Sequence, residues 1–201
     1  SSYGIVGSHQ LKKAALALKL DAGAVVEHGG ILGSQFTDHF GADQADTAFV
    51  NMAAHYDLSE NTTLQASFAK AITNVKTSSQ SYLSGFEDIH SESFGVGLSH
   101  QNLVRDGDAL SLSVSSPLKI TKGSANAYLP TRVSVDNEVI FEDQQINFTS
   151  AGREVRVGLG YNTSLSDHTK LEFGTIAAFD PGHNTQSKTD FGNFIKLKTT
   201  F

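Results

Sequence analysis

The residues that could do chemistry in this chain are its histidines and carboxylates, and their spacing predicts no compact catalytic or metal-binding motif. A metal or catalytic site needs several such groups at close, regular spacing, whereas the eight histidines are scattered at His9, His28, His39, His55, His90, His100, His168 and His183. The exception is His39, which has Asp38, Asp43 and Asp46 close by in one predicted loop. That group could hold a metal ion, and solvation of a polar loop is the simpler interpretation.

Two other groups resemble sites but are explained better by local structure. Ser99 and His100 are adjacent on one predicted strand, so they point to opposite faces and cannot act as nucleophile and base. The run Asp106-Gly107-Asp108 offers carboxylates to a calcium ion, but an Asp-Gly pair between two alternating segments is also a strong signal for a hairpin turn. We predict a hairpin turn at Asp106 and Gly107, and no catalysis, cofactor or metal in this chain.

Composition excludes several classes of protein. The 201 residues contain no cysteine and carry a formal net charge of −6, which removes thiol catalysis and disulfides and argues against nucleic acid as the partner. No segment approaches the roughly 20 apolar residues of a transmembrane helix. The length predicts one domain over residues 1–201, with 1–13 set aside as a linker or lead-in. The N-terminus shows no signal-peptide pattern.

The dominant pattern is alternation of apolar and polar residues, which is typical of strands with two different faces. It recurs in eight segments: 16–26, 48–56, 64–68, 94–98, 110–114, 155–161, 171–179 and 195–201. Residues 11–20 also fit a short amphipathic helix, but their alternation continues to Val26, which favours a strand.

Short and long connections alternate between these strands. Segments 58–64 and 165–171 resemble one turn used twice, whereas the long connections are 30–45, 74–91, 119–151 and 180–189. Segment 119–151 is expected to be a long external loop or a hairpin. Short turns at one end and long loops at the other are typical of outer-membrane barrels. The predicted fold is therefore all-β, an antiparallel up-and-down β-barrel of about eight strands, closed so that no edge is left unpaired.

The second face of the strands mixes glycine and serine with charges of both signs, which suits the narrow lumen of a small barrel and favours apolar residues facing lipid. Its charges predict a lumen ion-pair network, with a proton or solute path as the sharper alternative: Lys19, Asp21, Glu154, Arg156, Glu172, Lys196 and Lys198. The chain ends on alternating Ile195, Leu197 and Phe201, similar to the C-terminal signature of bacterial outer-membrane proteins. The absence of tryptophan counts against a membrane barrel, and a secreted soluble barrel that binds a small ligand is the inverted alternative.

Six short motifs resemble, in order, elements of the C-terminal barrels of bacterial subtilisin-family autotransporters. They are GILGSQF (30–36), LVRDGD (103–108), VSSPLKI (114–120), AYLP (127–130), SAGREV (150–155) and PGH (181–183). The resemblance implies an outer-membrane translocator that anchors or exports a protease passenger (type V secretion). The catalytic motifs of subtilisins are absent here, so any protease activity would lie in an upstream passenger.

The resemblance also implies partners for the chain, and the number of predicted strands differs from the number usual in the family. Such a domain meets outer-membrane lipid, the barrel-assembly machinery, and an upstream passenger or other outer-membrane subunits. Barrels of the family usually have 12 strands and a helix in the pore, so eight strands predict either the last part of such a barrel or a free-standing relative. A free-standing structural or adhesive subunit would use segments 74–91 and 119–151 for contacts. A closed eight-stranded barrel has a lumen filled by side chains and could not export a polypeptide.

Overall fold

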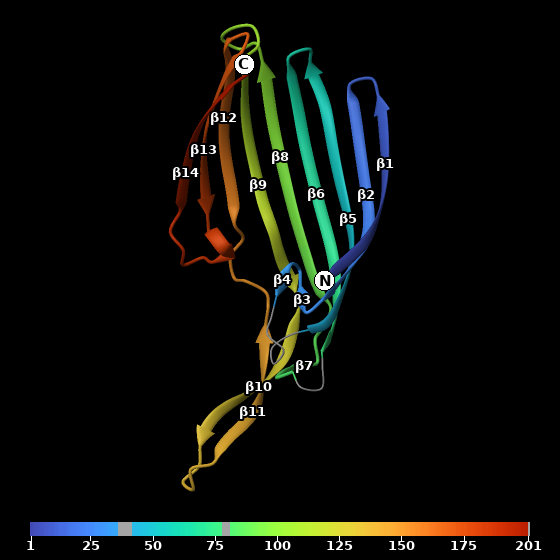
Figure 1. Ribbon diagram of the computed structural model, residues 1–201, viewed down its shortest axis with the longest axis vertical. Coiled ribbons are helices and arrows are strands. Elements are labelled where there is room, and N and C mark those ends of the chain that lie inside the picture. The colour runs from blue at the N-terminus through green and yellow to red at the C-terminus, as the bar shows by residue number, and fades with distance from the viewer. Residues whose placement is uncertain (36–41, 78–80, 201) are drawn as a thin grey trace.

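The computed structural model describes residues 1–35, 42–77 and 81–200, and most of them lie in one antiparallel sheet. The sheet has nine strands, which lie side by side in the order in which they occur along the chain (Figure 1). They are β1 (Ser2–Lys13), β2 (Leu16–His28), β5 (Ala42–Ser59), β6 (Thr62–Thr77), β8 (Ile89–Gln101), β9 (Ala109–Lys122), β12 (Val155–Ser166), β13 (Thr169–Phe179) and β14 (Asp190–Thr199).

The remaining elements lie in the connections. A hairpin of β10 (Ser124–Val133) and β11 (Val139–Asn147) pairs with the short β7 (Leu83–Ser84) and projects away from the main sheet (Figure 1). The other elements are the pair β3 (Gly30–Ile31) and β4 (Ser34–Gln35) and the 3-10 turn η1 (Pro181–His183). The hairpin falls in the segment expected to be a loop or a hairpin.

The up-and-down antiparallel arrangement predicted from the alternation is confirmed. Short connections at 14–15, 60–61, 102–108 and 167–168 lie at one end of the sheet, together with the C-terminus (Figure 1). The longer connections, which follow β2, β6, β9 and β13, leave the sheet at the other end. We call these the turn end and the loop end.

The two turns that looked alike in sequence have the same geometry. Each joins its strands through two residues, and each has a bulge just before it, at 57–59 in β5 and at 164–166 in β12. In each the last serine of the first strand, Ser59 or Ser166, accepts a hydrogen bond from the backbone N–H two residues later. The same local sequence therefore makes the same hairpin twice.

The predicted strand count and closure are wrong. The sheet has nine strands because residues 2–13, set aside as a linker, form β1, which turns into β2 through Ala14 and Ala15. Ala14 has φ 48°, a left-handed conformation that alanine seldom adopts, so the turn carries none of the usual turn residues. The sheet is open, because among the described residues β1 and β14 each pair on one side only.

The Asp-Gly turn differs from its prediction in length. The strands end at Gln101 and resume at Ala109, so Asp106 and Gly107 lie inside a seven-residue loop rather than forming a two-residue hairpin. They occupy the centre of a turn closed by a hydrogen bond from the Asp108 N–H to the Arg105 carbonyl oxygen, and Gly107 supplies the positive φ of 82° that this position requires.

Candidate functional site

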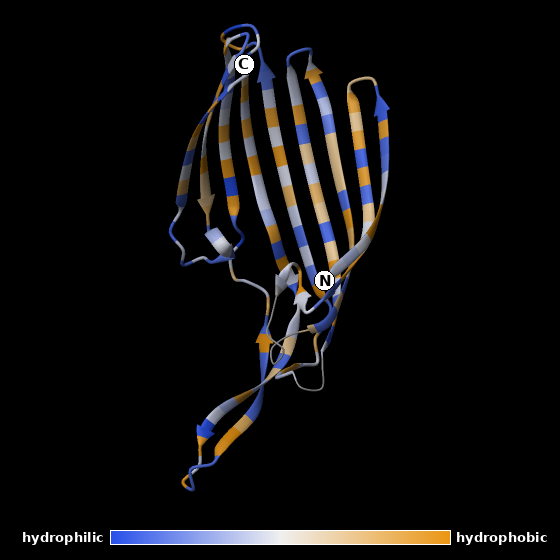
Figure 2. Ribbon diagram, in the orientation of Figure 1, coloured by the Kyte–Doolittle hydropathy of each residue, from blue (hydrophilic) through white to orange (hydrophobic). Residues whose placement is uncertain are grey.

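The strand register separates the main sheet into two continuous faces. Because paired residues point to the same side of a sheet, register can be followed across strands, and one such row is Leu11, Leu18, Ala54, Ala66, Val96, Val114, Val157, Ala177 and Phe191. The neighbouring row, one residue along, begins with Lys12, Ala17, His55, Gln65 and Gly97. We call these the apolar face and the inner face; they appear as alternating colours along the strands (Figure 2).

Large side chains on the apolar face are exposed rather than packed in a core. Met52 is 56% exposed, Val96 52% and Ile195 80%. The buried hydrophobic residues in the described part of the chain, by contrast, are few and mostly small: Ile31, Ala42, Ala45, Ile89, Ala125 and Ala127. A soluble protein of this size buries its large apolar side chains. The apolar face is therefore built to contact an apolar surrounding.

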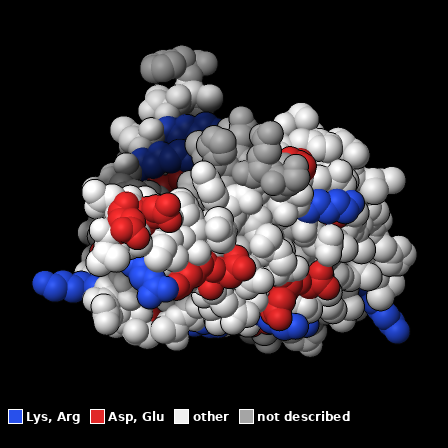
Figure 3. All heavy atoms as spheres, turned by 90° about the horizontal axis from the view of Figure 1, so that it is seen from below, with Lys and Arg blue, Asp and Glu red and all other residues white. Residues whose placement is uncertain are grey.

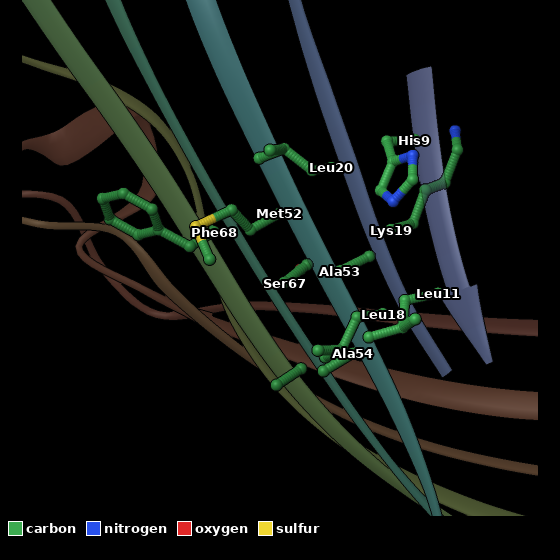
Figure 4. A pocket seen from close by; sticks show the side chains of 11 residues that line it. His9, Leu11, Leu18, Lys19, Leu20, Met52, Ala53, Ala54, Ser67 and Phe68 are labelled. Carbon is green, nitrogen blue, oxygen red and sulfur yellow. The ribbon is translucent and has the colours of Figure 1, made fainter. Parts of the chain in front are cut away.

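A hollow in this face lies over β1, β2, β5 and β6 (Figure 4). Ala54 and Ala66 form its floor because their side chains end at Cβ, and longer side chains surround them: Leu11, Leu18, Leu20, Met52 and Phe68. Its lining is almost entirely hydrocarbon, with His9 at one side. Such a surface can accept an alkyl chain, and the polar residues among those that line it are His9, Lys19 and Ser67.

The predicted ion-pair residues form three separate pairs. Lys19 Nζ lies 2.9 Å from Asp21 Oδ2, and Lys196 Nζ lies 3.1 Å from Glu172 Oε2. The third pair is Arg156 with Glu154. Lys198 stands opposite Lys170 in the register, and within 1–35, 42–77 and 81–200 no carboxylate pairs with it. No ion pair between described residues links one of these pairs to another, so they do not form a connected network there.

The inner face is crowded where aromatic rings lie over glycines. A Cβ atom placed on Gly174 would lie 2.5 Å from Cε1 of Phe194, and one on Gly23 would lie 2.9 Å from Cζ of Phe49. Only glycine lets these rings approach the backbone so closely. Gly97, on the same face, would place its Cβ 3.5 Å from the nearest atom, which is an ordinary contact.

We expect Gly174→Ala to destabilise the sheet by about 2 kcal/mol, because the new methyl group must displace the Phe194 ring. Urea unfolding in lipid vesicles would measure the change. Gly97→Ala is the matched control, since it adds the same methyl group to the same face without a close contact. Equal unfolding midpoints for the two variants would contradict the packing of Phe194 on Gly174.

At the loop end, Glu154 and His183 fasten the connection between β13 and β14 to the sheet. Glu154 is 5% exposed and accepts a hydrogen bond of 2.8 Å from the Gly182 N–H. That bond, against the opposing effect of burial and together with the bond from Arg156, holds the pKa of Glu154 below its ordinary value. The Glu154 N–H donates to Nδ1 of His183 at 2.9 Å, and Nε2 of the same ring lies 3.0 Å from the Leu118 carbonyl oxygen.

These contacts are structural. Both ring nitrogens of His183 and both carboxylate oxygens of Glu154 are engaged by neighbouring groups. Seen from the loop end, acidic and basic side chains are interspersed over the surface rather than gathered into one charged patch (Figure 3). Sequence reasoning placed Glu154 in the lumen and missed His183, because the residues of this contact lie about thirty positions apart along the chain.

At the turn end, Asp108 is 2% exposed and organises the 102–108 loop. Its carboxylate accepts hydrogen bonds from the backbone N–H groups of Leu103, Val104 and Arg105, at 2.7, 3.0 and 3.1 Å, and from the hydroxyl group of Tyr161 at 2.7 Å. Burial acts to raise its pKa, but these four bonds outweigh burial and hold the pKa of Asp108 below its ordinary value. Asp108 is thus a fixed anion that joins the loop to β12.

The other predicted residues are placed as follows. Ile195 and Leu197 lie on the apolar face of β14, 80% and 62% exposed, whereas Phe201 lies outside the described residues. Asp38 and His39 of the candidate metal loop also lie outside them. In 1–35, 42–77 and 81–200 no group of three or more histidine or acidic side chains is placed to hold a metal ion.

Comparison with known proteins identifies the fold and no closer relative. No protein-family model matches the chain, and no curated protein matches it. The chain is similar to a solved structure of in-vitro folded OmpT, an outer membrane protein of Vibrio cholerae, with a TM-score of 0.58 and 13% identity over 98% of this chain and 55% of that chain. A structure of the trimer form of OmpT is similar with a TM-score of 0.55 and 10% identity, over 98% of this chain and 54% of that chain.

The chain therefore has the fold of an outer-membrane β-barrel protein and spans about half the length of the solved chains that it matches. Within the described residues no helix is both long and apolar enough to cross a membrane.

Proposed function

We propose that this chain is a bilayer-spanning part of an outer-membrane β-barrel. The observation that carries the proposal is the exposed apolar face that crosses all nine strands, set against a buried core to which the described part of the chain contributes six hydrophobic residues. In a bilayer, hydrocarbon covers such a face, and the ladder between strands satisfies the backbone hydrogen-bonding groups. The fold shared with OmpT supports the same role.

The length of the apolar face agrees with a bilayer. On β2 the apolar positions run from Leu16 to Val26, and on β5 from Ala48 to Tyr56, with no charged residue on that face of these two strands between these limits. On the next two strands the same face carries Lys70, opposite Val50, and Glu92, opposite Lys70, both toward the loop end. Nine residues of strand extend about 27 Å, and a tilted transmembrane strand needs about 9–11 residues. Asp46, the next residue on this face of β5, pairs with Lys76 at 3.0 Å and would mark the polar boundary at the loop end.

Within this role we assign no catalysis to the chain, since the buried carboxylates of Asp108 and Glu154 and the ring of His183 are engaged in structural contacts. Its partners would be outer-membrane lipid and the barrel-assembly machinery. The resemblance of six ordered motifs to subtilisin-family autotransporters supports a second, finer proposal, that the barrel is a translocator for a passenger. Reading the coding sequence upstream of Ser1 tests that proposal, because a translocator requires a subtilisin-like passenger there.

The membrane proposal can be tested with tryptophan, because the chain has none. Phe68→Trp would place an indole on the apolar face, and His55→Trp would place one on the inner face. Each variant is reconstituted into vesicles whose acyl chains carry bromine, which quenches tryptophan fluorescence on contact. We expect strong quenching for Phe68→Trp and weak quenching for His55→Trp.

The reverse order of quenching would mean that the faces are inverted. Protein that remains in solution without detergent, and is quenched at neither position, would support the soluble ligand-binding barrel instead.

A further inference from the structure

The two outermost strands of the sheet each have a free edge. Every described residue of β1 and of β14 is exposed, over 12 and 10 residues. Among the described residues, β1 pairs only with β2 and β14 only with β13. A row of unpaired N–H and C=O groups inside a bilayer is strongly unfavourable, so in a membrane both edges must be paired.

Strand direction argues against pairing the two edges with each other. Successive strands alternate in direction, so in a sheet of nine the first and last, β1 and β14, both run from the loop end to the turn end. Joining them would make a parallel seam in an otherwise antiparallel barrel, whereas bacterial single-chain barrels have an even number of antiparallel strands. A second copy with its loops on the same side of the membrane meets the same obstacle at both seams.

The lysines near the turn end also argue against pairing β1 with β14. On the inner face at the turn end, Lys198 of β14 stands opposite Lys170 of β13. Direct closure would bring Lys12, near the turn end of β1 on the same face, toward these two lysines. No ion pair involving any of the three occurs within 1–35, 42–77 and 81–200, and like charges placed opposite one another destabilise a sheet.

The similarity to OmpT indicates how many strands a complete barrel would have. The nine strands align with 55% of that chain, so a complete barrel of the same build would have about sixteen strands. The number of strands to be added to nine must be odd, because the strand next to β1 and the strand next to β14 must both run from the turn end to the loop end.

We propose that both free edges pair with an odd-numbered set of further antiparallel strands of the same polypeptide, outside residues 1–201, that carry carboxylates on the inner face near the turn end. This inference rests on the proposed membrane function. The added strands would continue the apolar face toward lipid and neutralise Lys12 and Lys198. The lumen would then be that of a large barrel rather than the filled interior of an eight-stranded one.

Disulfide trapping tests the edges directly, because the chain contains no cysteine. In the protein taken from its own membrane, Leu11→Cys is combined in turn with cysteine at Phe191, Asn193, Ile195 or Leu197. These four positions share the apolar face of β14 and cover the registers open to a β1–β14 pair. The positive control is Leu11→Cys with Leu18→Cys, which are partners in the β1–β2 ladder.

Hydrogen exchange of β1 and β14 is measured on the same material. We expect efficient oxidation of the control only, together with slow exchange along both outer edges. A disulfide between β1 and β14 within one chain would show self-closure, and one between two chains would show closure by a second copy. Fast exchange along both edges would show that they remain open. Each of these three results overturns the inference.

The proposed carboxylate partner of Lys198 is tested by a separate pair of variants. Lys198→Glu should speed exchange along the outer edge of β14 at least tenfold, and Lys198→Arg should not. Equal exchange in the two variants would overturn the proposed carboxylate partner. Because quenching at Phe68→Trp reports membrane contact independently, a β1–β14 disulfide in a chain that is still quenched would overturn this inference and leave the proposed function standing.

Discussion

Replacing Val96 by arginine is expected to block insertion of the sheet into a bilayer. Val96 is 52% exposed, on the apolar face of β8 between Ala66 and Val114 in the middle of the nine-stranded sheet. Arginine on the lipid face of a transmembrane barrel costs about 2–4 kcal/mol near the bilayer midplane. That is a large share of the stability of a typical domain, so the folded fraction in vesicles should fall sharply.

The matched control is Gln65→Arg. Gln65 is exposed on the inner face of β6, in register with Gly97 of β8, one position along from Val96. Gln65→Arg adds the same charge next to β8, but on the inner face rather than the apolar face. Folding into vesicles is followed by migration on unheated SDS gels, on which closed barrels migrate differently from boiled chains. Equal losses for Val96→Arg and Gln65→Arg would contradict the assignment of the faces.

Alternation of residue types accounts for most of what sequence predicted correctly. A strand with lipid or core on one side only must alternate, and β5 does so from Ala48 to Tyr56. The same logic assigned Lys19, Asp21, Glu172 and Lys196 to one face, where the structure pairs them. An alternating pattern predicts the faces of a strand correctly because it depends only on the pleat of that strand and not on long-range contacts.

The strand that sequence missed shows the limit of that logic. On the apolar face of β1, Gly7 and His9 interrupt the apolar series between Ile5 and Leu11, so the alternation is weak. The turn that follows is two alanines, and nothing in their side chains favours the left-handed conformation that Ala14 adopts. Strand β1 is therefore specified by its pairing with β2, which a local pattern does not reveal.

Closure was the other error, and its cause is also non-local. Counting eight strands made an even number and so allowed a self-contained antiparallel barrel. Adding β1 changes the parity and places two strands of the same direction at the two edges. A single missed strand thus reverses the expectation about closure, although every other strand in the sheet was located.

The role of Asp108 was equally hidden, because Tyr161, which binds it, lies 53 residues away in sequence. Sequence reasoning explained the Asp-Gly pair as a turn and left the second aspartate without a role. A buried carboxylate with four donors is costly to disturb, since each donor loses its partner when the carboxylate is removed. The residue that holds the loop is thus Asp108 rather than Asp106.

We expect Asp108→Asn to lower the folding equilibrium constant at least about tenfold. In the native loop the carboxylate oxygens face only donors, from Leu103, Val104, Arg105 and Tyr161. An amide must turn its N–H₂ group toward at least one of these backbone N–H groups, that of Leu103 in the orientation that loses the fewest bonds, and leave it unpaired. Asp106→Asn is the control, because Asp106 is exposed in the same loop. Urea unfolding in vesicles at neutral pH measures both, and equal midpoints would contradict the role of Asp108.

The difference between wild type and Asp108→Asn should also depend on pH, and the sign follows from the lowered pKa of Asp108. A carboxylate with a lower pKa in the folded state stabilises the fold fully at pH values above the pKa of the unfolded chain, about 3.9 for an aspartate. The contribution is lost as pH falls through the lower, folded-state pKa. The gap between the two proteins should therefore be constant from neutral pH to about pH 5 and shrink in stronger acid. A gap that widens on acidification would mean that burial, rather than the four hydrogen bonds, dominates at this carboxylate.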